Sequence, residues 1–264
     1  MIQYRLLALD LDGTLLNGKQ EISPEDRAWI KRAQDAGVIV VLATGRGRKM
    51  SAQYWDVLDP ASPVLLVNGN EVWKNHTEVL ERHFLTREEV QDFLTLAETH
   101  HAWFWGNVVG DLVTKDNFTP AALDLEWLNF GIKHSDPATI EHLRELITGW
   151  DRSGVTSSAP SNLELSRPGV SKATGIAKIA DLLGIGRSEV MAVGDSLNDL
   201  EMLRWVGFGV AMGNGDEKVK AAADAVTKSH DEGGVAQAIK EYMFGWTQVG
   251  FSLGSSHGRK GTEE

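Results

Sequence analysis

The sequence predicts an α/β protein in which a parallel sheet wrapped by helices is interrupted by a second, α+β domain. Three observations predict this fold class. Short apolar runs alternate with helix signals at both ends of the chain. These runs are continuously apolar, as is typical of strands covered on both faces. Between residues 83 and 166 the alternation gives way to helix signals mixed with short strand candidates.

The N-terminal part begins this alternation. Three continuous apolar runs are expected to be buried strands: residues 6–9, 38–42 and 64–67. A helix is expected between the first two runs, because Ser23 suits the N-cap, Pro24 suits the first helical position and Gly37 ends the pattern.

The C-terminal part resumes the alternation. Ser171 is expected to cap a helix that Gly184 closes. Strands are expected at residues 190–193 and 208–211, and helices at residues 217–223 and 235–243.

In the inserted segment, helices are expected at residues 86–99 and 137–150, and strands at residues 102–105, 108–114 and 163–166. We therefore expect a discontinuous core formed by residues 1–82 and 167–244 and an inserted domain formed by residues 83–166. Residues 245–264 are rich in Gly and Ser and are expected to be a loose tail.

The composition excludes several function classes. The 264 residues carry a formal net charge of −11, which argues against nucleic acid and anionic membranes as partners. The lack of cysteine excludes disulfides, thiolate catalysis and Cys-based zinc sites. No apolar run is long enough to span a bilayer, and the N-terminus lacks the basic region of a signal peptide. We expect a cytoplasmic protein with a small-molecule partner, and leave its oligomeric state open.

The stretch LLALDLDGTLL at residues 6–16 has two interpretations. Asp-Gly between apolar runs is a strong signal for a β-hairpin, and this is the better interpretation of the stretch alone. The alternative is a buried strand that delivers Asp10 and Asp12 to a reaction.

Other polar segments decide between these interpretations, because they also fall near the ends of predicted strands. They are Thr44-Gly45-Arg46, Lys172 and the run from Gly194 to Asp199. The carboxyl ends of parallel strands share one edge of a sheet, where ligands bind. Segments far apart in the sequence are therefore expected to meet there.

Such a meeting indicates phosphoryl transfer. The carboxylates would repel one another unless a cation lay among them, and carboxylate oxygens suit Mg²⁺; they are Asp10, Asp12, Asp195 and Asp199. The hydroxyl of Thr44, the amide of Gly45 and the ammonium of Lys172 suit phosphate oxygens. Lys172 opens a helix, where the dipole disfavours a cation and favours an anionic ligand.

These motifs together resemble the four motifs of the haloacid-dehalogenase-like (HAD) hydrolase superfamily. The runs GVSK at residues 169–172, VAMGN at 210–214 and GGVA at 233–236 narrow the resemblance to Cof-type phosphatases with a C2B cap. The resemblance implies a Rossmann-like core with an inserted α+β cap, and a Mg²⁺-dependent phosphatase that hydrolyses a small phosphate monoester, with a sugar phosphate favoured. A phosphomutase and a non-catalytic phosphosugar-binding regulator are the alternatives.

The resemblance also implies roles. Asp10 is the expected nucleophile that forms an aspartyl-phosphate, and Asp12 the expected general acid and base. Mg²⁺ is expected on the carboxylates of Asp10 and Asp195 and the backbone carbonyl of Asp12, with Asp199 orienting these ligands and Lys172. The expected phosphate ligands are Leu11, Thr44, Gly45, Lys172 and Asn198.

Four further features keep two interpretations each. Arg46 either contacts substrate or forms a surface ion pair, and Asn68-Gly69-Asn70 either borders the substrate or is a plain turn. Residues 213–216 form either a phosphate-cradling loop or a turn. The four tryptophans of the inserted segment are expected in its core, with stacking on a ringed substrate as the alternative; they are Trp103, Trp105, Trp127 and Trp150.

Overall fold

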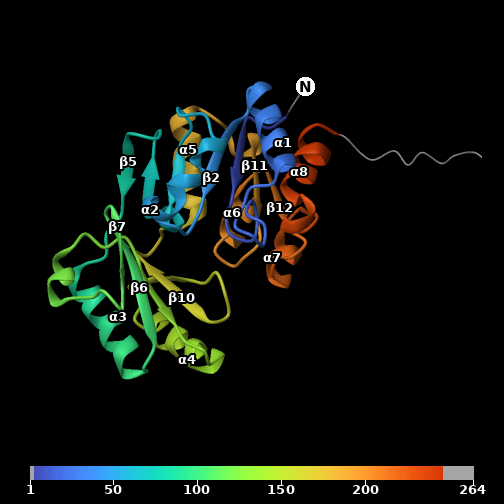
Figure 1. Cartoon of the computed structure of the whole chain (residues 1–264). Helices are drawn as coiled ribbons and strands as arrows, with labels where there is room; N and C mark the ends of the chain where they lie inside the picture. The colour runs from blue at the N-terminus through green and yellow to red at the C-terminus, as the bar shows by residue number, and fades with distance from the viewer. Residues whose placement is uncertain (1–2, 246–264) are drawn as a thin grey trace, which may run out of the picture.

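The protein consists of two β-sheets, each with its own helices (Figure 1). The computed structural model describes residues 3–245. The larger sheet is built from both ends of this range and the smaller sheet from its middle. We propose that the core domain and the inserted domain meet at residues 82/83 and 166/167.

The larger sheet has eight strands in the order β13-β12-β11-β1-β2-β3-β4-β5. The pairings from β13 to β3 are parallel, whereas β4 and β5 add antiparallel strands at one edge. The strands are β1 (Leu6–Leu9), β2 (Ile39–Ala43), β3 (Val64–Leu66), β4 (Glu71–Trp73), β5 (Val79–Arg82), β11 (Val190–Gly194), β12 (Phe208–Ala211) and β13 (Ala225–Val226). The predicted parallel sheet is confirmed.

The register of the central strands fixes the position of the polar segments. Leu9 lies opposite Leu42 of β2 and Val193 of β11. The residues that follow these three positions therefore emerge side by side at the carboxyl edge of the sheet.

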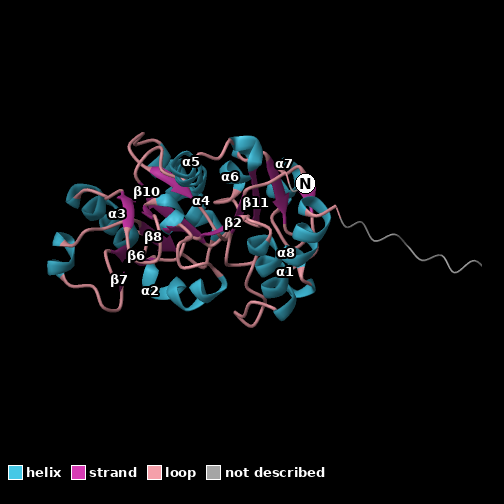
Figure 2. Ribbon diagram, turned by 90° about the horizontal axis from the view of Figure 1, so that it is seen from above, coloured by secondary structure: helices cyan, strands magenta, loops and turns pink. Residues whose placement is uncertain are grey.

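Helices cover both faces of this sheet, as Figure 2 shows. On one face α1 (Pro24–Asp35) packs with α8 (Gly234–Ala238), and on the other α5 (Lys172–Leu183) packs with α6 (Leu200–Trp205). Strand β1 supplies Leu7 and Leu9 to the first core and Leu6 and Ala8 to the second. This explains why its sequence is continuously apolar.

The smaller sheet, which we call the cap sheet, is antiparallel, in the order β7-β6-β8-β10-β9. Its strands are β6 (Trp103–Val108), β7 (Asp111–Thr114), β8 (Phe130–Lys133), β9 (Gly154–Thr156) and β10 (Asn162–Ser166). Two helices, α3 (Arg87–Thr99) and α4 (Pro137–Thr148), lie on the side of this sheet away from the larger one (Figure 1). The apolar residues between sheet and helices form a separate core.

The short elements complete the described chain. Helix α2 (Arg48–Ser51) follows β2, and α7 (Glu217–Ala222) follows β12. Helix α8 continues as a π-helical turn over Ile239–Met243, so the predicted helix at residues 235–243 changes its winding there.

Several details differ from the sequence prediction. The hairpin interpretation of residues 6–16 is wrong, because β1 pairs with β2 and β11 in parallel. The strand expected at residues 108–114 is interrupted by a turn at Gly110, whose φ is +83°. Strands β4, β5, β8, β9 and β13 were not predicted. The tail expected at residues 245–264 lies, apart from Gly245, outside the described residues.

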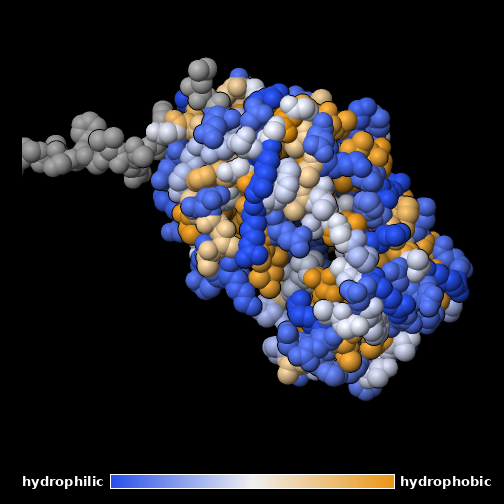
Figure 3. Space-filling view, turned by 180° about the vertical axis from the view of Figure 1, so that it is seen from behind, coloured by the Kyte–Doolittle hydropathy of each residue, from blue (hydrophilic) through white to orange (hydrophobic). Residues whose placement is uncertain are grey.

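The surface mixes residue types. Figure 3 shows hydrophilic and hydrophobic residues interspersed on the face turned away from the viewer of Figure 1. Among the helices of residues 3–245, none combines the length and the apolar character needed to cross a membrane.

Candidate active site

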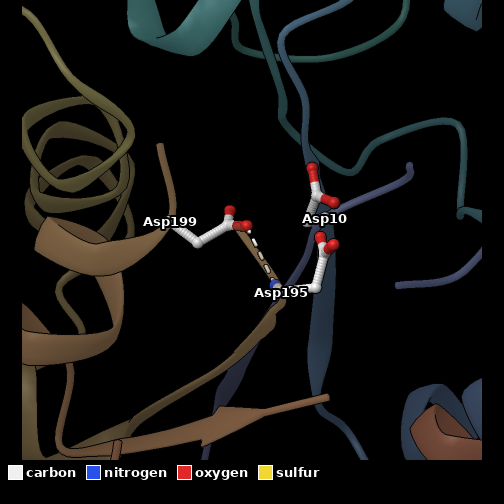
Figure 4. A group of neighbouring side chains, drawn as sticks. All are labelled: Asp10, Asp195 and Asp199. Atoms are coloured by element: carbon white, nitrogen blue, oxygen red, sulfur yellow. Dashed lines mark hydrogen bonds between the residues drawn. The ribbon is translucent and has the colours of Figure 1, made fainter. Parts of the chain in front are cut away.

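Segments far apart in the sequence meet at the carboxyl edge of the larger sheet. Asp10 follows β1, and its amide donates a hydrogen bond to the carbonyl of Val193 (3.1 Å). Lys172 is the first residue of α5, and its Nζ lies 2.6 Å from Oδ1 of Asp10 and 2.7 Å from Oδ1 of Asp199. Figure 4 shows the side chains of Asp10, Asp195 and Asp199 close to one another at this edge. The strand-end prediction is correct for these residues.

Lys172 is fully buried between two carboxylates. The Ser171 side chain caps its helix by accepting from the Thr174 amide (3.4 Å), and the Thr174 hydroxyl accepts from the Ser171 amide in return. Burial alone would lower the pKa of Lys172, but the carboxylates of Asp10 and Asp199 outweigh it and raise the pKa. The lysine therefore stays charged, and this ammonium is a fixed positive charge at the site.

Asp10 has one free oxygen. Its Oδ1 accepts from Lys172, whereas its buried Oδ2 has no hydrogen-bond partner among the described residues. Burial raises the pKa of Asp10 well above its ordinary value, and the nearby acids add to this against the lowering effect of Lys172. A buried acceptor without a partner is costly, so this oxygen is suited to a ligand that the protein itself does not supply.

A divalent cation fits this carboxylate group. Oxygens of Asp10, Asp195 and Asp199 all lie within 4.8 Å of one another. Burial, followed by the charge of Asp199, raises the pKa of Asp195 to about 6. A hard cation among the carboxylates would relieve this repulsion, and the donors are the oxygens that Mg²⁺ prefers.

Asp199 differs from the other two carboxylates, because both of its oxygens are already occupied. Oδ1 accepts from Lys172, and Oδ2 accepts from the amides of Asp195 (3.0 Å) and Ser196 (3.1 Å). These bonds hold the loop that carries Asp195. Asp199 is therefore better placed to orient the metal ligands than to be one.

Gly13 allows the segment after β1, which carries Asp10 and Asp12, to approach the segment after β11, which carries Asp195. Its φ is +77°, and a Cβ at this position would lie 2.4 Å from Oδ2 of Asp195. Only glycine combines this backbone conformation with this contact. Thr14 completes the approach by donating to Oδ1 of Asp195 (3.2 Å).

Asp12 points to the open part of the site. Its side chain is half exposed, and both of its oxygens accept from the guanidinium of Arg46, with a distance of 2.8 Å from Nε to Oδ2. The side-chain hydrogen bond to Asp12 is the main cause of the raised pKa of Arg46. Arg46 thus forms an ion pair, but not at the surface, since its side chain is only 14% exposed. Arg46 also lines the cavity described next, so its contact with substrate stays a prediction.

A cavity of about 600 Å³ lies between the two sheets. Its core side includes Asp10, Asp12, Gly45 and Asn198, and its cap side includes residues of β6, β8 and β10. Apart from Ser158, the cap residues that line the cavity lie on strands. Successive side chains alternate between faces, so one face of the cap sheet carries Trp103, Trp105, Asn107, Lys133, Asn162 and Glu164.

The expectation that the cap tryptophans are core residues is wrong for two of them. Trp103 and Trp105 line the cavity, whereas Trp127 and Trp150 pack in the cap core. Sequence reasoning also missed Asn107, Lys133, Asn162 and Glu164. The period of two along the short cap strands is the signal that could have found them.

Glu164 connects the cap to the core side of the cavity. Its Oε2 accepts from Nδ2 of Asn68 (2.5 Å), and Oδ1 of Asn68 accepts from Nδ2 of Asn198 (3.2 Å). Glu164 is buried, and this burial raises its pKa. Asn68 adopts a φ of 53°, in the left-handed region that Asn tolerates better than most residues, and its hydrogen bonds to Glu164 and Asn198 hold its amide between core and cap. Asn68 therefore lies behind the cavity lining, in contact with Glu164 and Asn198, and a contact of the segment Asn68-Gly69-Asn70 with substrate stays a prediction.

The loop at residues 213–216 contacts two of the segments that form the site. Nδ2 of Asn214 donates to the carbonyl of Gly13 (2.8 Å), and the amide of Asp216 donates to the carbonyl of Asp195 (2.8 Å). These bonds connect the loop to the segment after β1 and to the segment after β11. Asp216 is also the N-cap of α7. This favours the turn interpretation over the phosphate loop.

Comparison with known proteins agrees with this geometry. A family model for haloacid dehalogenase-like hydrolases matches residues 7–121 and 114–239. The chain belongs to this family. The Cof-type resemblance and the prediction of a phosphatase are confirmed as well.

Individual relatives cover almost the whole chain. The 5-amino-6-(5-phospho-D-ribitylamino)uracil phosphatase YcsE of Bacillus subtilis is 37% identical over 242 residues, which are 92% of this chain and 97% of that protein. A haloacid dehalogenase-like hydrolase from B. subtilis superposes with a TM-score of 0.81 at 27% identity, covering 89% of this chain and 99% of that one. A HAD subclass IIB sugar phosphatase superposes with a TM-score of 0.78 at 25% identity, covering 90% and 98%.

Proposed function

We propose that this phosphatase hydrolyses a small phosphate monoester with Mg²⁺ through an aspartyl-phosphate on Asp10. The unpartnered buried Oδ2 of Asp10, beside Lys172 and Asp195, is the observation that carries the proposal. When bound to Asp10, Asp195 and the backbone carbonyl of Asp12, Mg²⁺ would neutralise charge on the transferring phosphoryl group.

The side chains divide the reaction into two steps. In the first, a carboxylate oxygen of Asp10 attacks phosphorus, and the ester oxygen leaves with a proton from Asp12. In the second, Asp12 takes a proton from water, which attacks phosphorus and releases phosphate and Asp10. Asp12 is suited to both proton transfers because it lies at the open side of the cavity, and Arg46 orients it.

Other groups hold the phosphoryl oxygens in this proposal. Lys172 supplies a buried positive charge, and Thr44, Gly45 and the Leu11 amide surround the carboxyl end of β1 and β2. Asn198 is positioned by Asn68. Such fixed donors stabilise charge in the transition state because they need no rearrangement during the reaction.

The substrate expectation from the sequence was a sugar phosphate, and it stays a proposal. The relatives named above act on different esters: a ribitylaminouracil phosphate in one case and sugar phosphates in another. We also retain the cytoplasmic location as a proposal.

A phosphate-release screen tests the function. Sugar, nucleotide and vitamin phosphates are offered with Mg²⁺ and with excess EDTA. Release that requires Mg²⁺ and is lost in Asp10→Asn supports the proposal. Isomer interconversion without phosphate release would indicate a phosphomutase, and binding without turnover would indicate a regulator.

A further inference from the structure

The cavity has two chemically different ends. The core end carries the acids, the lysine and the amides that the proposed reaction uses. The cap end carries Trp103, Trp105 and Lys133, which no step of that reaction requires. A volume of about 600 Å³ leaves room for a group considerably larger than a phosphate.

The two tryptophans form an aromatic surface on the cap sheet. Trp103 and Trp105 are two residues apart on β6, so both face the cavity, and their rings lie 5.8 Å apart with an interplanar angle of 27°. Gly131 of β8 lies opposite Trp105, and a Cβ there would come within 2.2 Å of the ring. The glycine therefore lets the Trp105 ring lie directly against the sheet.

This surface is exposed although the rings are large and apolar. Trp103 is 36% exposed, and its Nε1 is directed towards Asp116 (3.4 Å), which fixes the orientation of the ring. Met50 of α2 lines the same cavity from the core side and is 42% exposed. Exposed apolar side chains that gather at one concave place mark a binding site rather than a core.

Lys133 adds a positive charge beside the rings. It lies opposite Trp103 across the β6–β8 pairing and lines the same cavity. Within residues 3–245 no carboxylate lies within ion-pair distance of its ammonium, whereas Arg46, another cation of the cavity, is paired with Asp12. An ammonium at a binding site without a protein partner is suited to an acceptor on the ligand.

We propose that Trp103, Trp105 and Lys133 form a subsite for the leaving group of the ester, and that this group contains a planar heteroaromatic ring with a hydrogen-bond acceptor at its edge. The ring stacks on the tryptophans, and its acceptor binds Lys133. Asn162 and Ser158 line the same cavity and suit hydroxyls of a chain that joins ring to phosphate. This assignment rests on the proposed phosphatase function.

Matched pairs of esters test the subsite. Flavin mononucleotide is compared with ribitol 5-phosphate, and uridine 5′-phosphate with ribose 5-phosphate; within each pair the second ester carries a hydroxyl where the first carries the ring. Stacking of a base on an aromatic side chain contributes about 1–3 kcal/mol, so we expect kcat/KM of at least one ring ester to exceed that of its partner about tenfold or more.

Three variants test whether a preference for the ring ester depends on the residues of the subsite. Trp105→Leu and Lys133→Met should lower kcat/KM of the ring ester more than that of its ringless partner, and Trp105→Phe should restore part of the difference. Trp150→Leu is the control, because Trp150 stacks on Phe93 in the cap core, away from the cavity. It should leave the ratio within each pair unchanged.

A binding measurement separates the subsite from the catalytic proposal. Calorimetry with riboflavin and uridine, which carry no phosphate, measures the ring subsite without turnover. Binding that Trp105→Leu abolishes supports the subsite even if no ester is hydrolysed, in which case the proposed function fails alone. Hydrolysis without ring preference, together with equal binding by wild type and Trp105→Leu, overturns the subsite and leaves the proposed function standing.

Discussion

The two sides of the cavity are built in different ways. On the core side, polar residues follow strand ends, and the buried Lys172 donates to the buried carboxylates of Asp10 and Asp199. On the cap side, residues come from one face of the strands, and Trp103 and Lys133 are exposed. The positions of the core side chains are therefore fixed by their contacts with one another. The cap surface can change without disturbing these contacts. We infer that the core fixes the chemistry and the cap selects the ester.

The largest expected effect comes from the core. Asp10→Asn should lower kcat for every ester by a factor of about 10⁴ or more, because it removes the proposed nucleophile. The control is Asp35→Asn, whose side chain is exposed in a pair with Lys31. Equal loss across the matched esters supports the division between core and cap, whereas a loss confined to some esters argues against it.

Lys172→Met should give the largest loss of stability. It leaves Asp10 and Asp199 buried without their cation, which costs about 3–5 kcal/mol. Lys31→Met makes the same change in an exposed pair and should cost less than about 0.5 kcal/mol. Urea unfolding measures the free energy of unfolding of both variants. Similar losses in the two would contradict the claim that the ion pairs of Lys172 are buried and hold the site together.

The core site could be predicted from the sequence because a simple rule applies to it. Asp10, Thr44 and Asp195 each follow a continuously apolar strand, and parallel strands end at one edge. The rule for the cap, a period of two along each strand, depends on recognising strands that are short and weakly marked. Strand β8 is four residues long and contains Gly131, and an exposed Trp103 has the same sequence signature as a buried Trp127.

Contacts across the cavity were also beyond sequence reasoning. The bond from Asn68 to Glu164 joins residues 96 positions apart, and it depends on how the cap sits on the core. The edge hairpin of β4 and β5 was missed for a related reason. Both strands are short, and the pairing of β4 with β3 and of β5 with β4 stabilises them more than their own composition does.

Gly131→Ala tests the cap without removing a cavity side chain. The added Cβ would displace the Trp105 ring, so kcat/KM for a ring ester should fall about five- to tenfold relative to its ringless partner. Gly149→Ala is the control, because its Cβ would meet ordinary van der Waals distances at the end of α4. An unchanged ratio in Gly131→Ala would show that the position of the Trp105 ring does not matter.

The smallest expected effect is a pH dependence of stability at the contact between cap and core. Burial raises the pKa of Glu164, so the folded state holds this proton more tightly than the unfolded state. Stability contributed by Glu164 is therefore complete below its ordinary value of 4.5 and falls as the pH rises through its raised pKa.

Glu164→Gln removes this dependence while keeping an acceptor for Asn68. The free energy of unfolding of the variant, relative to wild type, should increase as the pH rises through that window. Glu98→Gln, at an exposed position of α3, should follow wild type at every pH. Parallel curves for wild type and Glu164→Gln would argue against a buried, protonated Glu164.

The most direct test of the central claim is to locate the phosphoryl group during turnover. Wild type is mixed with Mg²⁺ and the best ester from the screen, quenched in acid within a single turnover, digested and analysed by mass spectrometry. The account predicts a phosphorylated peptide with the modification on Asp10, absent in Asp10→Asn. Phosphorylation of another residue, or rapid phosphate release without any phosphorylated peptide, would contradict it.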